Sequence, residues 1–138
     1  MTNLTLKARE VFANDRYATE ATNVVIDWVE AHAAQCSIAL APIHRNALGA
    51  VMGGVMFTLA DLAFAASANS DRLAEDAQLA WVSLSSSIQY LSQPKGNTLV
   101  AKSTCVKQGR TTCVYNINIT DENNNLAAII TTTGMRIN

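Results

Sequence analysis

Residues 44–69 read HRNALGAVMGGVMFTLADLAFAASAN, and this stretch decides how the chain folds. Its first part holds loop and cap residues and ends in Gly53 and Gly54, after which apolar side chains occupy almost every position up to Asn69. A helix that is apolar nearly all round must be covered on nearly every side. Because Asp61 lies in its middle, where a charge would cost about 2.5–3.5 kcal/mol in a bilayer, the segment is interpreted as a buried helix and not as a membrane span.

Strand-like segments lie on both sides of this helix in the sequence. Two precede it, at 23–29 and 36–41, with a hairpin turn expected near 31–34, and four follow it, at 79–91, 98–107, 112–120 and 126–137. Polar turns separate the later strands, and their spacing favours antiparallel meander connections. In the first of these, simple alternation places five side chains on one face: Val82, Leu84, Ser86, Ile88 and Tyr90. The sequence therefore predicts an α+β fold in which one antiparallel sheet curls around one long helix.

Length and composition indicate a single domain. The chain has 138 residues and no Pro/Gly-rich linker, so we expect one domain over 1–138 with an N-terminal helical segment at 1–20, which includes an amphipathic helix near 4–14. A net charge of −1 argues against partners such as nucleic acid or an anionic membrane surface. Only 15% of the residues are charged, so we expect part of the surface to face another subunit.

The cysteines and the N-terminus point to a reduced, cytoplasmic setting. Cys36, Cys105 and Cys113 form no C-x-x-C pair and have no histidine at ligand spacing, so neither a disulfide framework nor a metal site is expected. The first residues are charged and lack the apolar core of a signal peptide.

The glycine pair and Asp61 together have a chemical use. Gly53 and Gly54 at a helix start would expose unpaired N–H groups that can hold a developing oxyanion. Asp61 is eight residues further, roughly 12 Å along the axis, and cannot reach a carbonyl bound at its own helix start. If both act in one reaction, two subunits must share the site, with their helices antiparallel across a twofold axis. The alternative is an ordinary glycine-rich helix start and an aspartate that is paired at an interface.

At this point the residues resemble a known family, the PaaI-type hotdog-fold acyl-CoA thioesterases. The family pattern is H-x-N-x-x-G-x-x-H-G-G followed by a helix that carries Asp or Glu, and this chain has His44, Asn46, Gly49 and Gly53-Gly54, then Asp61. The later segments Ser86-Ser-Ile-Gln-Tyr90 and Gln108-Gly-Arg-Thr111 are also similar to the family's strand after the helix and its G-R-[RT] turn. The resemblance covers residues 24–137.

The resemblance implies a hotdog fold, a homodimer often paired into a tetramer, and hydrolysis of acyl-CoA thioesters without metal or bound cofactor. It implies that Asp61 attacks the thioester or activates water, that the Gly53 N–H polarises the carbonyl from the other subunit, and that Asn46 orients thioester or water. Further expected substrate contacts are His44, Met52, Gly54, Ser85, Ser86, Lys107 and Arg110, of which the last two would lie toward the nucleotide of coenzyme A.

Met52 is the departure from the family pattern, because the family has histidine there and a thioether cannot hydrogen-bond as imidazole does. A second hypothesis is therefore a non-catalytic hotdog protein that binds acyl-CoA or a fatty acyl ligand. A hotdog hydratase or dehydratase ranks last, since His44 is the only nearby imidazole and matches the loop histidine of the thioesterase pattern.

Overall fold

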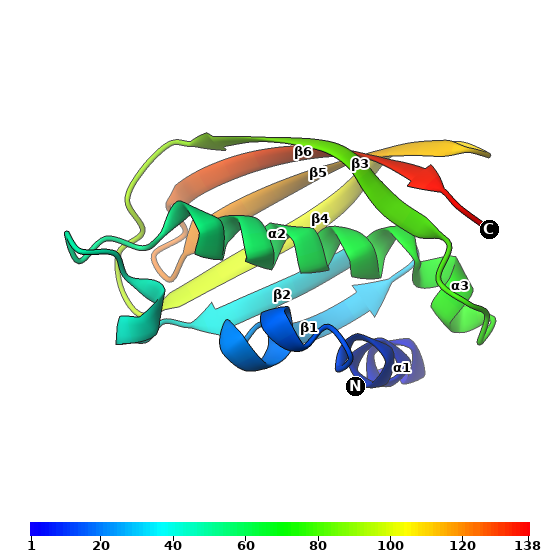
Figure 1. Cartoon of the computed structure of the whole chain (residues 1–138), viewed down its shortest axis with the longest axis horizontal. Helices are drawn as coiled ribbons and strands as arrows, with labels where there is room; N and C mark the ends of the chain where they lie inside the picture. The colour runs from blue at the N-terminus through cyan, green and yellow to red at the C-terminus, as the bar shows by residue number, and fades with distance from the viewer.

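One long helix lies in the concave face of a curved antiparallel sheet. The computed structural model describes residues 1–138, and in it helix α2 (Gly53–Ala68) runs across a six-stranded sheet with the order β1-β2-β4-β5-β6-β3 (Figure 1). Every pair of neighbouring strands is antiparallel. The predicted α+β class and the sheet wrapped around a central helix are therefore confirmed.

The N-terminal part comprises α1 (Asn3–Phe12), a short π-helical turn η1 (Tyr17–Ala21), and strands β1 (Val25–Glu30) and β2 (Ala33–Ala39). The Thr2 hydroxyl accepts from the Thr5 N–H at 3.1 Å and begins α1, as an N-cap residue does. The expected hairpin is present, but its turn is only Ala31 and His32, and β2 begins three residues before the predicted Cys36. His32 adopts a left-handed φ of 58°, which lets two residues close the turn.

The remaining elements are a 3-10 turn η2 (Pro42–His44), the short α3 (Ser70–Ala74), and strands β3 (Trp81–Tyr90), β4 (Thr98–Gln108), β5 (Thr112–Asp121) and β6 (Leu126–Arg136). These four strands match the prediction closely. The meander is correct only for β4-β5-β6, because β3 pairs with β6 at one edge and β4 pairs with β2. Residues 91–97 carry the chain from β3 to β4.

A register shift in β3 changes which of its side chains face the helix. Ser83 pairs with Gly134 and Ser85 with Thr133, so Leu84 is an extra residue in the ladder. Such a bulge reverses the alternation beyond it. The prediction that Val82 and Leu84 share a face with Ser86 was therefore wrong, and Val82 and Leu84 are 40% and 61% exposed.

The core lies between α2 and the sheet. Leu59, Leu62 and Phe64 of α2 are buried, and the Phe64 ring meets the Tyr115 ring of β5 edge-on with centroids 5.6 Å apart. Full burial of each such side chain contributes roughly 1.5–3 kcal/mol to folding. The helix is less enclosed than predicted, because Gly54 and Asp61 are exposed along one face of it.

The structure also shows the state of the three cysteines and the length of the helices. Cys36 and Cys113 are buried, Cys105 is half-buried, and all three are free thiols. The longest helix, α2, is 16 residues, and no helix is both long enough and apolar enough to span a membrane.

Candidate active site

The loop before α2 is held by a buried histidine. The His44 Nε2–H donates to the Thr22 carbonyl at 2.8 Å, and its Nδ1 accepts from the Ala41 N–H at 3.0 Å. These two bonds select the neutral tautomer with its proton on Nε2. The expected contact with substrate is therefore not available to its ring nitrogens, and His44 positions the loop instead. The Met52 N–H donates to the His44 carbonyl at 3.0 Å and fixes the start of the helix.

Asn46 closes the tip of this loop. Its side-chain oxygen accepts from the N–H groups of Leu48 and Ala50 at 2.9 and 3.1 Å, and Gly49 adopts a φ of 79° that favours glycine. The side-chain amide group of Asn46 makes no hydrogen bond and is exposed. It is thus free to donate to a bound molecule while its oxygen holds the loop.

The first turn of α2 presents unpaired donors. Met52 is the N-cap residue and supplies no side-chain cap, and the N–H groups of Gly53 and Gly54 have no acceptor within the chain. At a helix N-terminus such donors attract negative charge. A Cβ on Gly53 would lie 2.7 Å from the Tyr90 hydroxyl, whereas a Cβ on Gly54 would enter open space. The Tyr90 hydroxyl also donates to the Gly53 carbonyl at 3.0 Å, so β3 holds the helix start.

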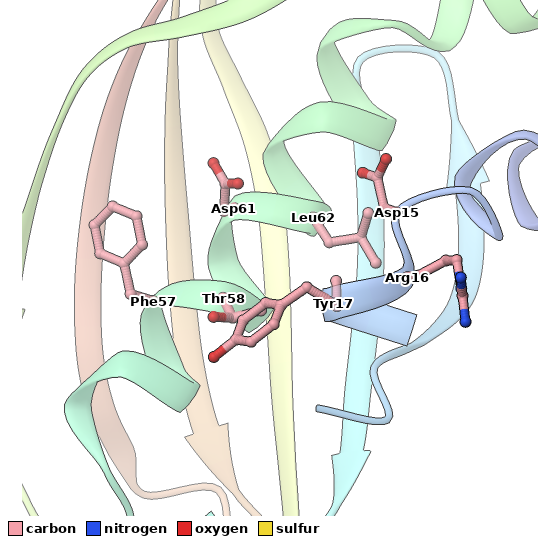
Figure 2. Close-up of a pocket in the computed structure, with 8 residues that line it drawn as sticks. Asp15, Arg16, Tyr17, Phe57, Thr58, Asp61 and Leu62 are labelled. Atoms are coloured by element: carbon pink, nitrogen blue, oxygen red, sulfur yellow. The ribbon is translucent and has the colours of Figure 1, made fainter. Parts of the chain in front are cut away.

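Asp61 faces a pocket of its own, of about 340 Å³. Figure 2 shows its carboxylate extending from one side of α2, while Leu62 extends on the side where Asp15 and Arg16 lie. The lining residues are Asp15, Arg16, Tyr17, Ala18, Phe57, Thr58, Asp61 and Leu62. The carboxylate has no hydrogen-bond or ion-pair partner within the chain. Desolvation, and secondarily the charge of Asp15, raise the pKa of Asp61 above its usual value of 3.8.

The helix start faces a different pocket, of about 470 Å³, lined by Val51, Gly53, Met56, Tyr90, Leu91, Ser92 and Gln93. Asp61 and Gly53 lie on one continuous helix, about 12 Å apart along its axis. The two groups do not meet within one chain.

The structure separates the two candidate serines. The Ser86 side chain points to the helix side of the sheet, where its hydroxyl lies 2.9 Å from that of the buried Thr132. Ser85 is the preceding residue and therefore points to the outer face, where it is exposed. Only Ser86 of the two serines therefore lies on the helix side of the sheet, and contact of either serine with substrate stays a prediction.

Lys107 and Arg110 lie at the far end of the molecule from Gly53. Both are exposed, and the neighbouring Gln108 donates to the carbonyl of Ala68, the last residue of α2. Within one chain these cations are therefore near the C-terminal end of the helix, at the opposite end from the free N–H groups.

Sequence reasoning missed the N-terminal contribution to the Asp61 pocket. Asp15 and Tyr17 belong to a polar stretch with no motif, and nothing in their local pattern indicates that they reach α2. Only packing of η1 against α2 brings them there.

A single antiparallel sheet that curves around one long helix, with free N–H groups at the helix start and a carboxylate halfway along it, defines a hotdog-fold protein. Similarity to known proteins agrees with this class. The model of the thioesterase superfamily matches residues 48–128. The Escherichia coli PaaI protein from the phenylacetic acid degradation operon is 26% identical, with a TM-score of 0.85 over 99% of this chain and 97% of that one.

Two further relatives extend the comparison. A hypothetical thioesterase of Streptococcus pneumoniae TIGR4, solved with coenzyme A, is 27% identical, with a TM-score of 0.79 over 91% of this chain and 96% of that one. A provisionally named esterase of Archaeoglobus fulgidus is 35% identical over 96 residues, which are 69% of this chain. The chain spans only 58% of that relative's length. The chain belongs to the thioesterase superfamily, and the resemblance to its PaaI-type hotdog members is confirmed.

Proposed function

We propose that this protein hydrolyses acyl-CoA thioesters to a free acid and coenzyme A. The observation that carries the proposal is the Asp61 carboxylate, which faces a partly apolar pocket without any partner in its own chain. Asp61 is exposed to solvent in the single chain, but the protein around it raises its pKa through desolvation, and the pocket leaves the carboxylate open to a ligand. A family of thioesterases and a relative solved with coenzyme A support the substrate class.

In the proposed reaction, the thioester carbonyl accepts hydrogen bonds from the free N–H groups at a helix start. Asp61 takes a proton from a water molecule as the water oxygen bonds to the carbonyl carbon. The negative charge that develops on the carbonyl oxygen is stabilised by the Gly53 N–H and the positive end of the helix. The carbon–sulfur bond then breaks as the carbonyl re-forms to give the free acid, and the thiolate of coenzyme A takes the proton that Asp61 holds, which restores the carboxylate. A second version has Asp61 attack the carbon directly, with water hydrolysing the resulting anhydride.

Asn46 would orient the thioester or the water through its free amide group. His44 and Gly49 hold the loop that carries it, and Ser86 is the serine that the sheet turns toward the helix. No metal or bound cofactor enters this scheme, because a carboxylate, water and backbone donors supply every step.

The proposal requires two subunits. Asp61 and Gly53 open into separate pockets of one chain, and an antiparallel pair of α2 helices would bring the Asp61 of each chain toward the Gly53 of the other. The open space beside Gly54 and the low charge content support a surface that faces a partner. We therefore propose a homodimer with shared sites, which pairs into a tetramer, in the cytoplasm.

Such a dimer would also bring Lys107 and Arg110 close to the helix start of the other subunit. They are distant from Gly53 in one chain, but antiparallel helices would place the C-terminal end of one α2 near the N-terminal end of the other. In that arrangement both cations could bind the phosphates of coenzyme A. The acyl group would be an aryl-acyl or a short to medium chain.

The test is thiol release from acetyl-, hexanoyl-, palmitoyl- and phenylacetyl-CoA, followed with a thiol-reactive dye. We expect turnover by the natural sequence and loss of at least 100-fold in kcat for Asp61→Asn, the order of effect of removing a positioned base or nucleophile. Asp76→Asn is the matched control, because Asp76 is exposed, lines neither pocket, and has a φ of 54° that asparagine tolerates; the change removes only an exposed ion pair with Lys7. Equal activity of Asp61→Asn and Asp76→Asn would refute the role of Asp61.

Met52 motivates a second candidate, a protein that binds acyl-CoA without hydrolysing it. Its side chain is 44% exposed at the helix start and offers no hydrogen bond to a carbonyl. Calorimetric titration with acyl-CoA distinguishes the two. Binding without turnover in both the natural sequence and Asp61→Asn would favour this candidate. Unchanged affinity with lost turnover in Asp61→Asn would favour the enzyme.

A further inference from the structure

The N-terminal segment builds one side of the Asp61 pocket. Asp15, Arg16, Tyr17 and Ala18 line it together with four residues of α2. Figure 2 shows the Tyr17 side chain extended from this segment toward α2. The segment precedes the first strand of the sheet, so the hotdog core does not require it there.

Local hydrogen bonds hold the segment in place. The Val24 N–H donates to the Ala18 carbonyl at 2.9 Å, and the Thr22 N–H donates to the Tyr17 carbonyl at 3.0 Å. The Thr19 hydroxyl and N–H both donate to the Asp15 carbonyl at 3.0 Å. Ala18 also packs against the core. The backbone that carries Tyr17 is thus hydrogen-bonded to the residue just before β1 and packed against the core, so its position beside α2 is fixed.

The Tyr17 side chain itself is neither packed in the core nor hydrogen-bonded within the chain. It is 72% exposed, and its hydroxyl makes no hydrogen bond. Arg16, the preceding residue, is instead paired with Glu20 at 2.7 Å. An aromatic ring with no packing or hydrogen-bonding role, on the rim of a pocket that holds an unpaired carboxylate, is available for a ligand.

The pocket suits the acyl part of a substrate. Its volume of about 340 Å³ is at the small end for ligand sites, which makes it too small for the nucleotide and pantetheine of coenzyme A. Ala18, Phe57 and Leu62 add apolar surface to its lining. If the thioester carbon is at the Asp61 carboxylate, the acyl group occupies the space between α2 and the N-terminal segment.

We infer that Tyr17 is a specificity-determining residue, whose ring contacts the acyl group beyond its α-carbon and favours longer or broader acyl groups over acetyl. This inference rests on the proposed function for the position of the thioester. It assigns to the N-terminal segment a role in the choice of substrate, separate from the hydrolytic step that we assign to α2.

The experiment compares kcat/KM for hexanoyl-CoA and acetyl-CoA in three variants. For Tyr17→Ala, we expect the hexanoyl-to-acetyl ratio to fall roughly 3- to 10-fold, which corresponds to the loss of one aromatic contact. Tyr17→Phe keeps the ring and should keep the ratio within twofold, since the hydroxyl has no partner. Leu6→Ala removes another exposed apolar side chain, which lines none of the described pockets, and serves as the control. An unchanged ratio in Tyr17→Ala, or a fall of equal size in Tyr17→Phe, would overturn the inference.

A binding measurement separates this inference from the proposed hydrolysis. S-hexyl-CoA and S-ethyl-CoA are thioethers that cannot be hydrolysed, so their dissociation constants are measurable whether or not the protein is an enzyme. We expect Tyr17→Ala to weaken S-hexyl-CoA more than S-ethyl-CoA by the same 3- to 10-fold. Absence of turnover in the natural sequence would count against the proposed function alone. Equal weakening of both thioethers would refute the role of Tyr17 alone.

Discussion

Replacement of Gly53 by alanine tests the proposed oxyanion donor most directly. The added Cβ would lie 2.7 Å from the Tyr90 hydroxyl and 2.8 Å from its ring carbon Cζ, closer than carbon atoms approach in proteins. Tyr90 is half exposed, at 51%, so its ring can swing outward. The Gly53 N–H then remains, but a methyl group occupies the space beside it through which a carbonyl would approach.

The contacts of Gly53 allow estimates of how much Gly53→Ala changes the free energy of unfolding and how much it changes kcat. Loss of the 3.0 Å bond from Tyr90 to the Gly53 carbonyl costs about 0.5–1.5 kcal/mol of stability, and alanine regains up to about 1 kcal/mol over glycine in a helix. The free energy of unfolding should therefore change by less than about 1.5 kcal/mol. Removal of one oxyanion donor costs about 100- to 1,000-fold in kcat, and a methyl group that keeps the carbonyl away from the Gly53 N–H should have an effect of the same order, so Gly53→Ala should lose activity far more than stability.

Thiol release and urea denaturation measure the two quantities. Tyr90→Phe is the control for the lost hydrogen bond, and the double variant Gly53→Ala/Tyr90→Ala removes the clash with the ring. If the methyl group itself blocks the carbonyl, the double variant stays inactive; if the displaced helix start is the cause, the double variant recovers. Activity of Gly53→Ala within threefold of the natural sequence would refute the assignment of the Gly53 N–H.

Three further predictions concern charge, loop position and packing. Asp61 must be ionised to act, and the charge of Asp15 contributes to its raised pKa, so Asp15→Asn should move the acidic limb of the kcat/KM profile to lower pH; an unmoved limb would contradict the coupling. His44→Ala leaves a buried backbone N–H and a carbonyl without partners and should lower the free energy of unfolding by about 1–3 kcal/mol for each group left unsatisfied, measured in urea. A Cβ on Gly134 would lie 2.7 Å from two buried side chains, so Gly134→Ala should destabilise by about 1–3 kcal/mol, whereas Gly54→Ala, in open space, should be as stable as the natural sequence or more so; equal melting temperatures for the two variants would contradict this packing.

Local patterns predicted most of the elements. The apolar run after Gly53 indicated α2 to within a residue, and the four later strands match their alternating segments, because side-chain periodicity directly reflects which face is buried. The loop amide, the glycine pair and Asp61 were found by residue type and spacing. Their separation along one helix also follows from the sequence alone, since helical rise is constant.

Long-range pairing was not predictable in the same way. The strand order that places β3 beside β6 depends on how the whole sheet curls around α2. The short turns in the sequence indicate only that consecutive strands are neighbours, which predicts a simple meander. The bulge at Leu84 leaves no mark in the alternation, although it decides that Ser86 and not Ser85 faces the helix. A loop histidine such as His44 reads as solvated until its two backbone partners, 22 and three residues away, are known.

The sequence by itself determined the helix, the strands and the chemical groups of the site, because each depends on residues close together in the chain. Only the tertiary structure decided the surroundings of Asp61. Packing of the N-terminal segment against α2 places Tyr17 and a second carboxylate, Asp15, at the Asp61 pocket. The Gly53 N–H group faces a different pocket. Contacts between residues more than 40 positions apart arise from the fit of whole elements, which no local pattern encodes.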